Sequence, residues 1–210
     1  MGIKTLLPGT HILTVAQDNA LSDEELMARI AGSDAQAFEI LVRRHQQHIL
    51  NLIHRSLGDR AQAEDVAQEV FLRVWRAAKG YEPKAKFTTW VYRIAVNLCL
   101  DAMKSAHHKQ SFIHPDAGSE EQGENNELLY GYDHAGSPEE HLLTAEESRR
   151  IFAALQSLPA NQRLAVILKK FDGLSYDEIS RIMGCSIPAV ESLLVRAKRT
   201  LREKLLLPGS

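Results

Sequence analysis

The sequence predicts an all-α protein made of two small helical domains that an acidic linker joins. Three observations support this fold class. Apolar residues recur at the three- and four-residue spacing of amphipathic helices. Capping-box sequences mark several helix starts, each with a serine followed three residues later by glutamate or glutamine. The charge is also segregated, because residues 109–147 carry a net charge of −9 whereas the whole chain carries −2.

Length and composition predict a cytoplasmic protein without a metal or other cofactor. The 210 residues allow one or two domains with hydrophobic cores. No apolar run approaches the ~20 residues of a membrane-spanning helix, since proline, glycine and histidine interrupt residues 6–15. Two cysteines, Cys99 and Cys185, are too few for a zinc site or a disulfide framework. Two histidines, His45 and His48, could share a helix face, but a metal site needs three or four ligands.

The chain divides into four segments, namely a leader over 1–19, a first domain over 20–108, an acidic linker over 109–138 and a second domain over 139–207. The leader is expected to be disordered. The linker contains glycine and proline with little apolar periodicity, which is typical of a flexible segment. Residues 148–210 carry a net charge of +6, so basic charge is concentrated in the second domain.

The first domain is expected to begin with two helices. Capping boxes are predicted at Ser22–Glu25 and at Ser33–Gln36. The second box opens a helix that Gly58 and Asp59 end. The apolar face of this helix contains Phe38, Leu41, Val42, Ile49, Leu52 and Ile53.

A third helix is predicted from about Arg60 to Lys79. It also carries a polar patch, because Asp65, Gln68 and Glu69 follow the i, i+3, i+4 spacing of one helix face. The patch could bind a partner, or it could be an ordinary solvated face. The buried side is expected to contain Val66, Val70, Phe71, Val74 and Trp75.

After a loop over residues 80–86, a fourth helix begins at Phe87 and concentrates aromatic, threonine and arginine residues. Flat rings beside basic and amide groups suit unpaired bases, which stack on aromatic side chains for ~1–3 kcal/mol each. The alternative is a packed core helix. For Trp90 and Ile94 taken individually, core packing is the favoured interpretation.

Residues 174–201 of the second domain predict a helix-turn-helix. A capping box at Ser175–Glu178 starts a helix of about two turns, and Gly184 ends it. Ser186 caps the next helix, and Pro188 falls in the first turn, where a missing N–H costs little. The buried face of that helix is expected to contain Val190, Leu193, Leu194, Ala197, Leu201 and Leu205. Its basic face could meet DNA phosphates, or it could simply be solvated.

Several motifs in order resemble the bacterial extracytoplasmic-function (ECF) sigma factors of the sigma-70 family. They lie at residues 63–71, at 87–97, and at 158–159 together with 172–179. The resemblance covers nearly everything between residues 20 and 206. It implies a sigma region 2 bundle in the first domain and a region 4 helix-turn-helix in the second.

The resemblance implies roles for the first domain and the linker. The face formed by Asp65, Gln68 and Glu69 would dock on the clamp helices of the polymerase β′ subunit. The loop and the fourth helix would recognise and melt the −10 element, with Asn97 near a non-template base. The acidic linker resembles a segment that threads polymerase channels near the active site. The implied −10 residues are Tyr81, Lys84, Lys86, Trp90, Arg93, Asn97 and Lys104, of which Arg93 and Lys104 could equally be surface charges.

The resemblance also implies that the last helix reads the −35 element. The implied residues are Ser186, Pro188, Glu191, Ser192, Val195, Arg196, Lys198 and Arg199. Family members often have basic residues where this chain has Glu191 and Leu193. This departure argues against transferring a known −35 sequence to this chain, and Glu191 could instead accept a hydrogen bond from a cytosine amino group.

The expected function is that of a non-catalytic sigma factor with no small-molecule substrate. Its partners would be the β and β′ subunits of core RNA polymerase, promoter DNA, and an anti-sigma factor that could hold it at the inner membrane. The alternative is a free-standing helix-turn-helix regulator of duplex DNA. Such a regulator would need neither the polar patch nor the aromatic helix, and it would usually dimerise. A chain with a net charge of −2 should bind DNA poorly alone.

Overall fold

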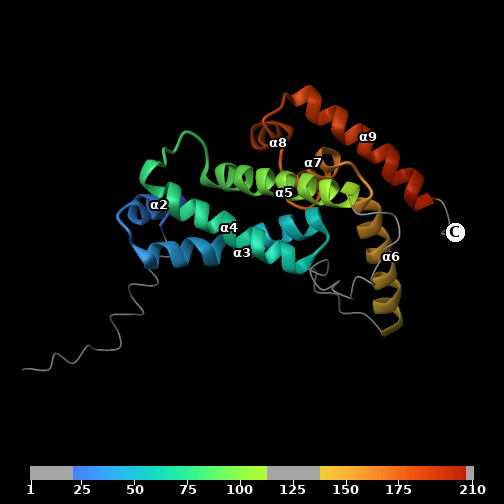
Figure 1. The fold of residues 1–210 in the computed structure, drawn as a ribbon, viewed down its shortest axis with the longest axis horizontal. Coiled ribbons are helices and arrows are strands. Elements are labelled where there is room, and N and C mark those ends of the chain that lie inside the picture. The colour runs from blue at the N-terminus through green and yellow to red at the C-terminus, as the bar shows by residue number, and fades with distance from the viewer. Residues whose placement is uncertain (1–20, 113–137, 207–210) are drawn as a thin grey trace, which may run out of the picture.

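The computed structural model describes residues 21–112 and 138–206, and the regular secondary structure in these ranges is helical (Figure 1). The predicted all-α fold class is confirmed. The predicted leader and most of the predicted acidic linker lie outside the described residues. Within the described ranges, no helix combines the length and the apolar composition needed to span a bilayer.

The first domain consists of α2 (Asp23–Ala31), α3 (Ala35–Leu57), α4 (Arg60–Ala77), the short 3-10 helix η1 (Ala78–Gly80) and α5 (Phe87–Phe112). Helix α3 packs against α2, α4 and α5, so it forms the centre of the bundle. Helix α5 extends well beyond the aromatic segment that predicted it. Its last turn therefore includes residues that the charge pattern had assigned to the linker.

One of the two predicted caps in this domain is confirmed and the other is wrong by one residue. The Ser22 N–H donates to Glu25 Oε2 at 2.7 Å, and the Glu25 N–H donates to Ser22 Oγ at 3.2 Å. At the second site the cap is Asp34, whose Oδ1 accepts from the N–H groups of Gln36 and Ala37. Ser33 instead adopts a positive φ of 66° in the turn. Asp34 is the stronger candidate because its carboxylate also pairs with Arg29 at 2.8 Å.

The second domain consists of α6 (Pro138–Gln156), α7 (Ala160–Lys170), α8 (Tyr176–Met183) and α9 (Ile187–Leu206). Helices α8 and α9 form the predicted helix-turn-helix. The capping box is complete, because the Ser175 N–H donates to Glu178 Oε2 at 2.9 Å and the Glu178 N–H donates to Ser175 Oγ at 3.3 Å. Gly184 follows with a φ of 65°, the left-handed conformation that ends α8.

Replacing the Ser175 cap should measurably weaken this domain. We expect Ser175→Ala to lower the free energy of unfolding by about 1 kcal/mol, because the Glu178 N–H loses its acceptor. Urea unfolding of the full chain measures this change. Ser105→Ala, at an exposed position of α5, is the control and should change stability by no more than about 0.5 kcal/mol. Equal effects of the two substitutions would contradict the capping role.

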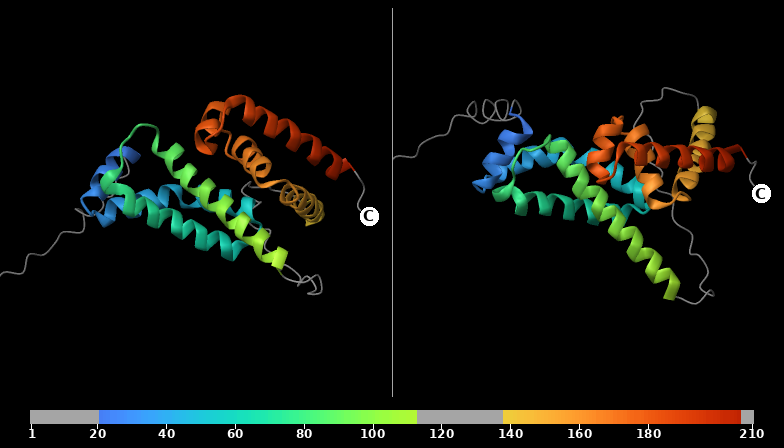
Figure 2. Two further views of the ribbon diagram at one scale, coloured as in Figure 1. Left: turned by 45° about the horizontal axis from the view of Figure 1, so that its top comes forward. Right: turned by 90° about the horizontal axis from the view of Figure 1, so that it is seen from above.

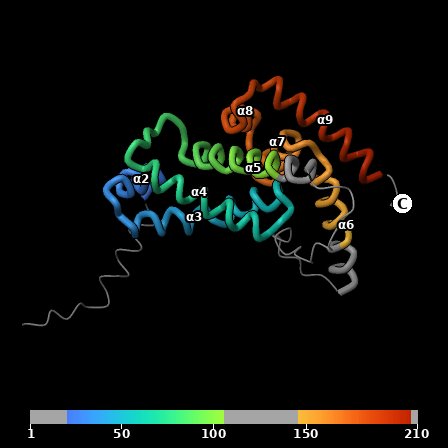
Figure 3. The backbone as a smooth tube through the Cα atoms, viewed as in Figure 1, coloured from blue at the N-terminus to red at the C-terminus, as the bar shows by residue number. Residues whose placement is uncertain are grey.

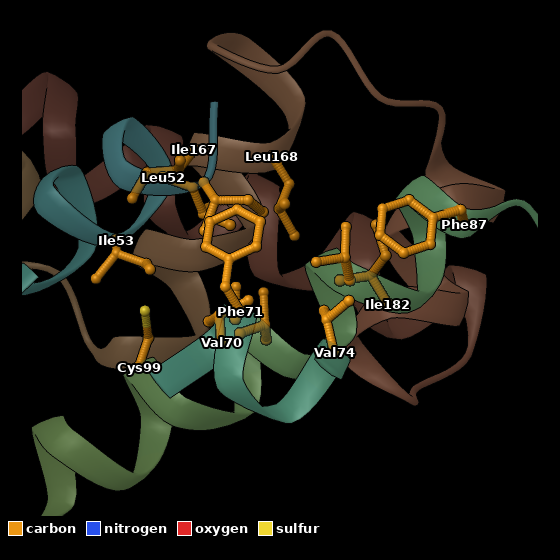
Figure 4. Packing of buried hydrophobic residues seen from close by; sticks show 14 of the residues in the cluster. Leu52, Ile53, Val70, Phe71, Val74, Phe87, Cys99, Ile167, Leu168 and Ile182 are labelled. Atoms are coloured by element: carbon orange, nitrogen blue, oxygen red, sulfur yellow. The ribbon is translucent and has the colours of Figure 1, made fainter. Parts of the chain in front are cut away.

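The two domains share one continuous hydrophobic cluster. Buried side chains of α3, α4 and α5 belong to the same cluster as those of α7, α8 and α9. Figure 4 shows part of this cluster, with Leu52 and Phe71 on the first-domain side and Ile167 and Leu168 on the second-domain side. Helix α8 packs against α5, and the views in Figure 2 and the chain path in Figure 3 show the second domain lying along that helix.

Candidate nucleic-acid and protein-docking surfaces

The polar patch on α4 lies on the surface, as the helical spacing predicts. The side chains of Asp65 and Gln68 are exposed, and Glu69 is partly exposed beside them. Glu69 Oε1 accepts a hydrogen bond from Arg73 Nε at 2.8 Å. This hydrogen bond lowers the pKa of the Glu69 carboxyl, so the group is ionised at neutral pH. The patch therefore presents carboxylates and an amide together.

An apolar groove borders this patch between α3 and α4. Its lining includes Gln68 of the patch together with Val42, Leu50, Phe71 and Leu72. The side chain of Leu72 is 47% exposed, so the groove continues onto exposed apolar surface. Sequence reasoning missed Leu72, although its place beyond the apolar stripe of α4 was a usable signal. A charged patch beside exposed apolar surface is typical of a protein-docking site.

The loop after η1 and the start of α5 form a second groove, which is rich in aromatic and basic side chains. Tyr81, Lys84, Trp90 and Arg93 line it, around a volume of about 690 Å³. The rings of Tyr81 and Trp90 lie 5.0 Å apart between centroids, and Phe87 lies 5.8 Å from Trp90. The structure therefore brings together four of the seven residues implied for the −10 element.

Aromatic residues of the core pack against the groove and hold its side chains in place. The buried ring of Phe87 supports Trp90, and the Phe87 N–H donates to Glu24 Oε1 of α2 at 3.1 Å. Trp90 is itself half-buried, so it contributes both to the core and to the groove. Burial, assisted by the nearby carboxylates of Glu24 and Asp23, raises the pKa of the Tyr81 phenol. Tyr81 is therefore a neutral hydroxyl at any physiological pH.

The other three residues implied for the −10 element lie outside this groove. Asn97 is exposed one turn beyond Arg93 on α5, so it extends the same surface along the helix. Lys86 is exposed in the loop. Lys104 instead lines a separate groove that α5 forms with the second domain, where Arg196 is also found. The structure therefore places Lys104 and Arg196 together, although sequence reasoning assigned them to different DNA elements.

All eight residues implied for the −35 element are exposed on α9 or just before it. Val195 is 69% exposed, which leaves the outer face of the helix open. Glu191, Val195 and Lys198 line a groove of about 740 Å³ with α7 and the start of α8. Arg196 lines the opposite groove, so the implied set wraps around more than one side of α9.

Three residues of the groove beside α9 escaped sequence reasoning. Lys169, Lys170 and Tyr176 line it together with Arg202 and the residues named above. The Lys169 ammonium lies 5.1 Å from the centroid of the Tyr176 ring and donates to the Leu174 carbonyl at 3.0 Å. The pair Lys169 and Lys170, which precedes the capping box at Ser175, could have indicated this basic surface in the sequence. They extend the basic surface of the helix-turn-helix beyond α9 itself.

A titratable contact joins the two domains beside these surfaces. Asp172, which follows α7, hydrogen-bonds to Tyr92 of α5 and lies near Arg55 of α3. Burial raises the pKa of the Asp172 carboxyl to about 6, against the favourable effects of Arg55 and of the Tyr92 hydrogen bond. The same burial raises the pKa of the Tyr92 phenol.

The raised pKa of Asp172 predicts a pH-dependent stability. The folded chain binds this proton more tightly than the unfolded chain, whose ordinary pKa is 3.8, so stability is lost as pH rises through about 6. Asp172→Asn stays neutral at every pH. We expect it to be more stable than the wild type by about 1–3 kcal/mol at about pH 7.5, and by less at about pH 4.5.

Urea unfolding at both pH values tests this prediction. Asp101→Asn removes an exposed carboxyl of α5 and serves as the matched control. The control should preserve the pH dependence of the wild type. An Asp172→Asn chain that is less stable than the wild type at the higher pH would show that the ionised carboxylate stabilises the domain contact.

Comparison with known proteins gives matches in both domains. Residues 41–108 match Sigma-70 region 2, and residues 148–201 match Sigma-70, region 4. The chain is 35% identical over 187 residues to the RNA polymerase sigma-H factor of Pseudomonas aeruginosa, covering 87% of this chain and 93% of that protein. It is 33% identical over 187 residues to the ECF RNA polymerase sigma-E factor of Escherichia coli K12, covering 88% and 95%.

Two solved structures share the fold. CnrH in complex with the cytosolic domain of CnrY has a TM-score of 0.60 at 24% identity, covering 87% of this chain and 96% of that one. The sigma factor RpoE of Bartonella quintana, in complex with the anti-sigma factor NepR, has a TM-score of 0.59 at 20% identity, covering 82% and 98%. At these identities the likeness extends to the fold alone.

Proposed function

The chain belongs to the ECF group of the sigma-70 family, and we infer from this that it is the sigma subunit that gives RNA polymerase its promoter specificity. The observation that carries this function is the 35% identity to a sigma factor over 93% of that protein's length, with both regions in order. The surfaces on the two domains then have distinct tasks. The chain itself supplies binding and positioning, and the bond chemistry belongs to the polymerase.

The α4 patch and its neighbouring groove are the proposed contact with the core enzyme. Asp65, Gln68 and Glu69 would meet the clamp helices of the β′ subunit through charge and hydrogen bonds. Leu72 and the groove beside it would bury apolar surface against the same partner. A polar edge around an apolar centre is the usual composition of a specific interface.

The groove of α5 is the proposed reader of the −10 element. Tyr81 and Trp90 offer ring surface to unstacked bases, whereas Lys84 and Arg93 can neutralise phosphates along the strand. Asn97 lies on the same helix and offers an amide to a non-template base. An aromatic and basic groove favours single-stranded over duplex DNA, which suits a factor that helps to melt a promoter.

Helix α9 is the proposed reader of the −35 element. Its N-terminal residues Pro188, Glu191 and Ser192 would face base edges in the major groove, and Lys198 and Arg199 would contact phosphates. Glu191 can accept from a cytosine amino group, which would set a preference at that position. Lys169, Lys170 and Tyr176 extend the proposed phosphate contacts.

We further propose that an anti-sigma factor controls this chain in the cytoplasm and can hold it at the inner membrane. The RpoE structure of the same fold is a complex with the anti-sigma factor NepR. The anti-sigma factor would cover the surfaces through which this chain binds the polymerase. Control of this kind needs no ligand-binding or catalytic site within the chain.

Binding measurements with and without polymerase test the proposed function. The full chain is mixed with Escherichia coli core polymerase and a fluorescent pool of duplex promoter fragments. We expect the chain to bind the core enzyme, and sequence-specific DNA binding to require both components. A chain that does not bind the core enzyme but binds duplex DNA specifically by itself would instead be a free-standing regulator.

A further inference from the structure

We propose that Glu24 of α2 caps the start of α5 from outside that helix and so acts as a positioning residue for the −10 groove. Its carboxylate holds the backbone at the point where α5 presents Tyr81 and Trp90 to DNA. Glu24 itself makes no contact with DNA in this account. This inference rests on the proposed function of the α5 groove as the reader of the −10 element.

The start of α5 has no cap within its own sequence. The Lys86 carbonyl accepts from the Trp90 N–H at 3.3 Å, so Lys86 occupies the N-cap position. A lysine side chain contains only donors and cannot accept from the first turn. Helices α2, α3, α4 and α8 instead follow a serine or an aspartate whose side chain accepts such a bond. The first turn of α5 also contains no acidic residue.

Glu24 supplies the missing acceptor from α2. The Phe87 N–H donates to Glu24 Oε1 at 3.1 Å, although the two residues are 63 positions apart in the sequence. Phe87 is the first residue of α5, where the N–H groups have no partner within the helix and the helix dipole is positive. The carboxylate therefore satisfies a backbone donor and also places a negative charge at the favourable end of the dipole.

Helix α2 provides firm support for this contact. Asp23 Oδ1 accepts from Arg44 Nη1 of α3 at 2.5 Å, and Asp23 Oδ2 lies 2.8 Å from Nε2 of the buried His45. Helix α2 also packs against α3 and η1. Figure 1 shows it at the same end of the bundle as the loop that precedes α5. The position of Glu24 is thus fixed by the core of the first domain.

The cap reaches the groove through the ring of Phe87. This ring is buried, and its centroid lies 6.3 Å from that of Tyr81 and 5.8 Å from that of Trp90. The His45 ring, which Asp23 holds, lies 5.2 Å from Phe87. Adjacent acidic residues of α2 therefore fix both the backbone and the side chain of Phe87. A shift of Phe87 would displace the two rings that line the groove.

A carboxylate is otherwise unfavourable beside a surface that binds DNA. Burial and the nearby carboxylates of Glu24 and Asp23 raise the pKa of the Tyr81 phenol, so both carboxylates lie close to the groove. They would repel the phosphates that Lys84 and Arg93 are proposed to neutralise. Removal of Glu24 would strengthen DNA binding if charge were its main effect, and would weaken it if the cap were. The two effects therefore have opposite signs.

Two variants of Glu24 and two controls separate these effects in the full chain. Glu24→Ala removes the acceptor, whereas Glu24→Gln keeps an acceptor oxygen and removes the charge. Glu25→Ala is the control for loss of stability, because its carboxylate accepts from the Ser22 N–H at 2.7 Å within α2. Glu39→Ala is the control for loss of charge, at an exposed position of α3 where Glu39 pairs with Arg43 at 2.5 Å.

The first measurement contains neither DNA nor polymerase. The chain has two tryptophans, so a Trp75→Phe background leaves Trp90 as the single fluorophore. We expect Glu24→Ala to increase the quenching of Trp90 fluorescence by acrylamide, because the start of α5 frays when the cap is lost. Glu24→Gln and both controls should match the background chain. Circular dichroism confirms beforehand that each variant retains its helices.

The second measurement follows promoter opening with Escherichia coli core polymerase, by 2-aminopurine fluorescence in the −10 region of a promoter selected with the wild type. We expect Glu24→Ala to reduce opening by up to about fivefold, because the groove forms only while the start of α5 is ordered and loss of a helix cap disfavours that state by about this factor. Its affinity for core polymerase should be unchanged. Glu24→Gln should restore most of the opening, and both controls should open the promoter as the wild type does.

Three results would overturn the positioning role of Glu24. The first is unchanged quenching of Trp90 in Glu24→Ala. The second is better opening by both Glu24 variants, which would show that the carboxylate acts through charge. The third is an equal loss of opening in Glu25→Ala, which would assign the effect to general stability. If the wild type itself does not bind the core enzyme, the proposed function fails, and the quenching of Trp90 still tests the cap.

Discussion

Replacing Asp65, Gln68 and Glu69 together with alanine is expected to weaken binding to core polymerase about 100-fold, since interface truncations of about 1 kcal/mol each add to about 3 kcal/mol. The three side chains lie on one face of α4 beside the groove that contains Leu72. Removing them deletes two charges and an amide without touching the buried side of the helix. Competition between labelled wild type and unlabelled variant for the core enzyme gives the ratio of affinities.

A matched control separates this contact from charge alone. The variant Gln36→Ala/Glu39→Ala/Glu203→Ala removes the same number of exposed carboxylates and amides elsewhere. Glu39 also pairs with an arginine four residues later, as Glu69 does. The control should compete like the wild type. Equal competition by the α4 variant would place the polymerase contact on another face of the chain.

The double variant Arg93→Ala/Asn97→Ala is expected to bind core polymerase normally but to lose promoter opening. Both side chains are exposed on α5, so their removal leaves the core intact. A phosphate contact and a base contact are together worth about 2–4 kcal/mol, which corresponds to a loss of about 30- to 1,000-fold. Fluorescence of 2-aminopurine in the −10 region of a promoter selected with the wild type measures opening.

The control for this variant is Arg43→Ala/Gln36→Ala, which removes an arginine and an amide from exposed positions of α3. It should open the promoter as the wild type does. Normal opening by the α5 variant would contradict the assignment of this surface to the −10 element. Loss of binding to core polymerase by the same variant would show that α5 contacts the polymerase instead of the −10 element.

The sequence predicted the helix starts well where side chain and backbone interact locally. The caps at Ser22 and Ser175 depend on residues only three positions apart, so the motif contains all the required information. The second cap was assigned one residue early, because Ser33 and Asp34 are both good caps. Asp34 is the observed cap, and its other carboxylate oxygen pairs with Arg29 near the end of the preceding helix.

The exposed parts of the candidate surfaces also follow from the sequence, because helical spacing sets which residues share a face. Helical spacing alone was enough to predict that the patch residues share one face of α4 and that Arg93 and Asn97 share one face of α5. The resemblance to a known family then suggested their tasks. Residues that join a surface from another element, such as Lys169 and Tyr176, could not be found from the periodicity of α9.

The contact between the domains was not predictable from local patterns. Arg163 donates to the carbonyl of Ser56, more than 100 residues away in the sequence, and backbone carbonyls carry no sequence signal. The joint placement of Lys104 and Arg196 has the same origin, because α5 and α9 meet only when the domains pack. Charge counts along the chain describe each domain and contain no information about their contact.

Run-off transcription tests the sigma-factor assignment most directly. Purified core polymerase from Escherichia coli is supplied with a library of promoter fragments, with and without the full-length chain. The assignment predicts discrete transcripts that appear only with the chain and disappear with the Asp65/Gln68/Glu69 variant. Transcripts that are the same with and without the chain, while the chain binds duplex DNA specifically by itself, would contradict it.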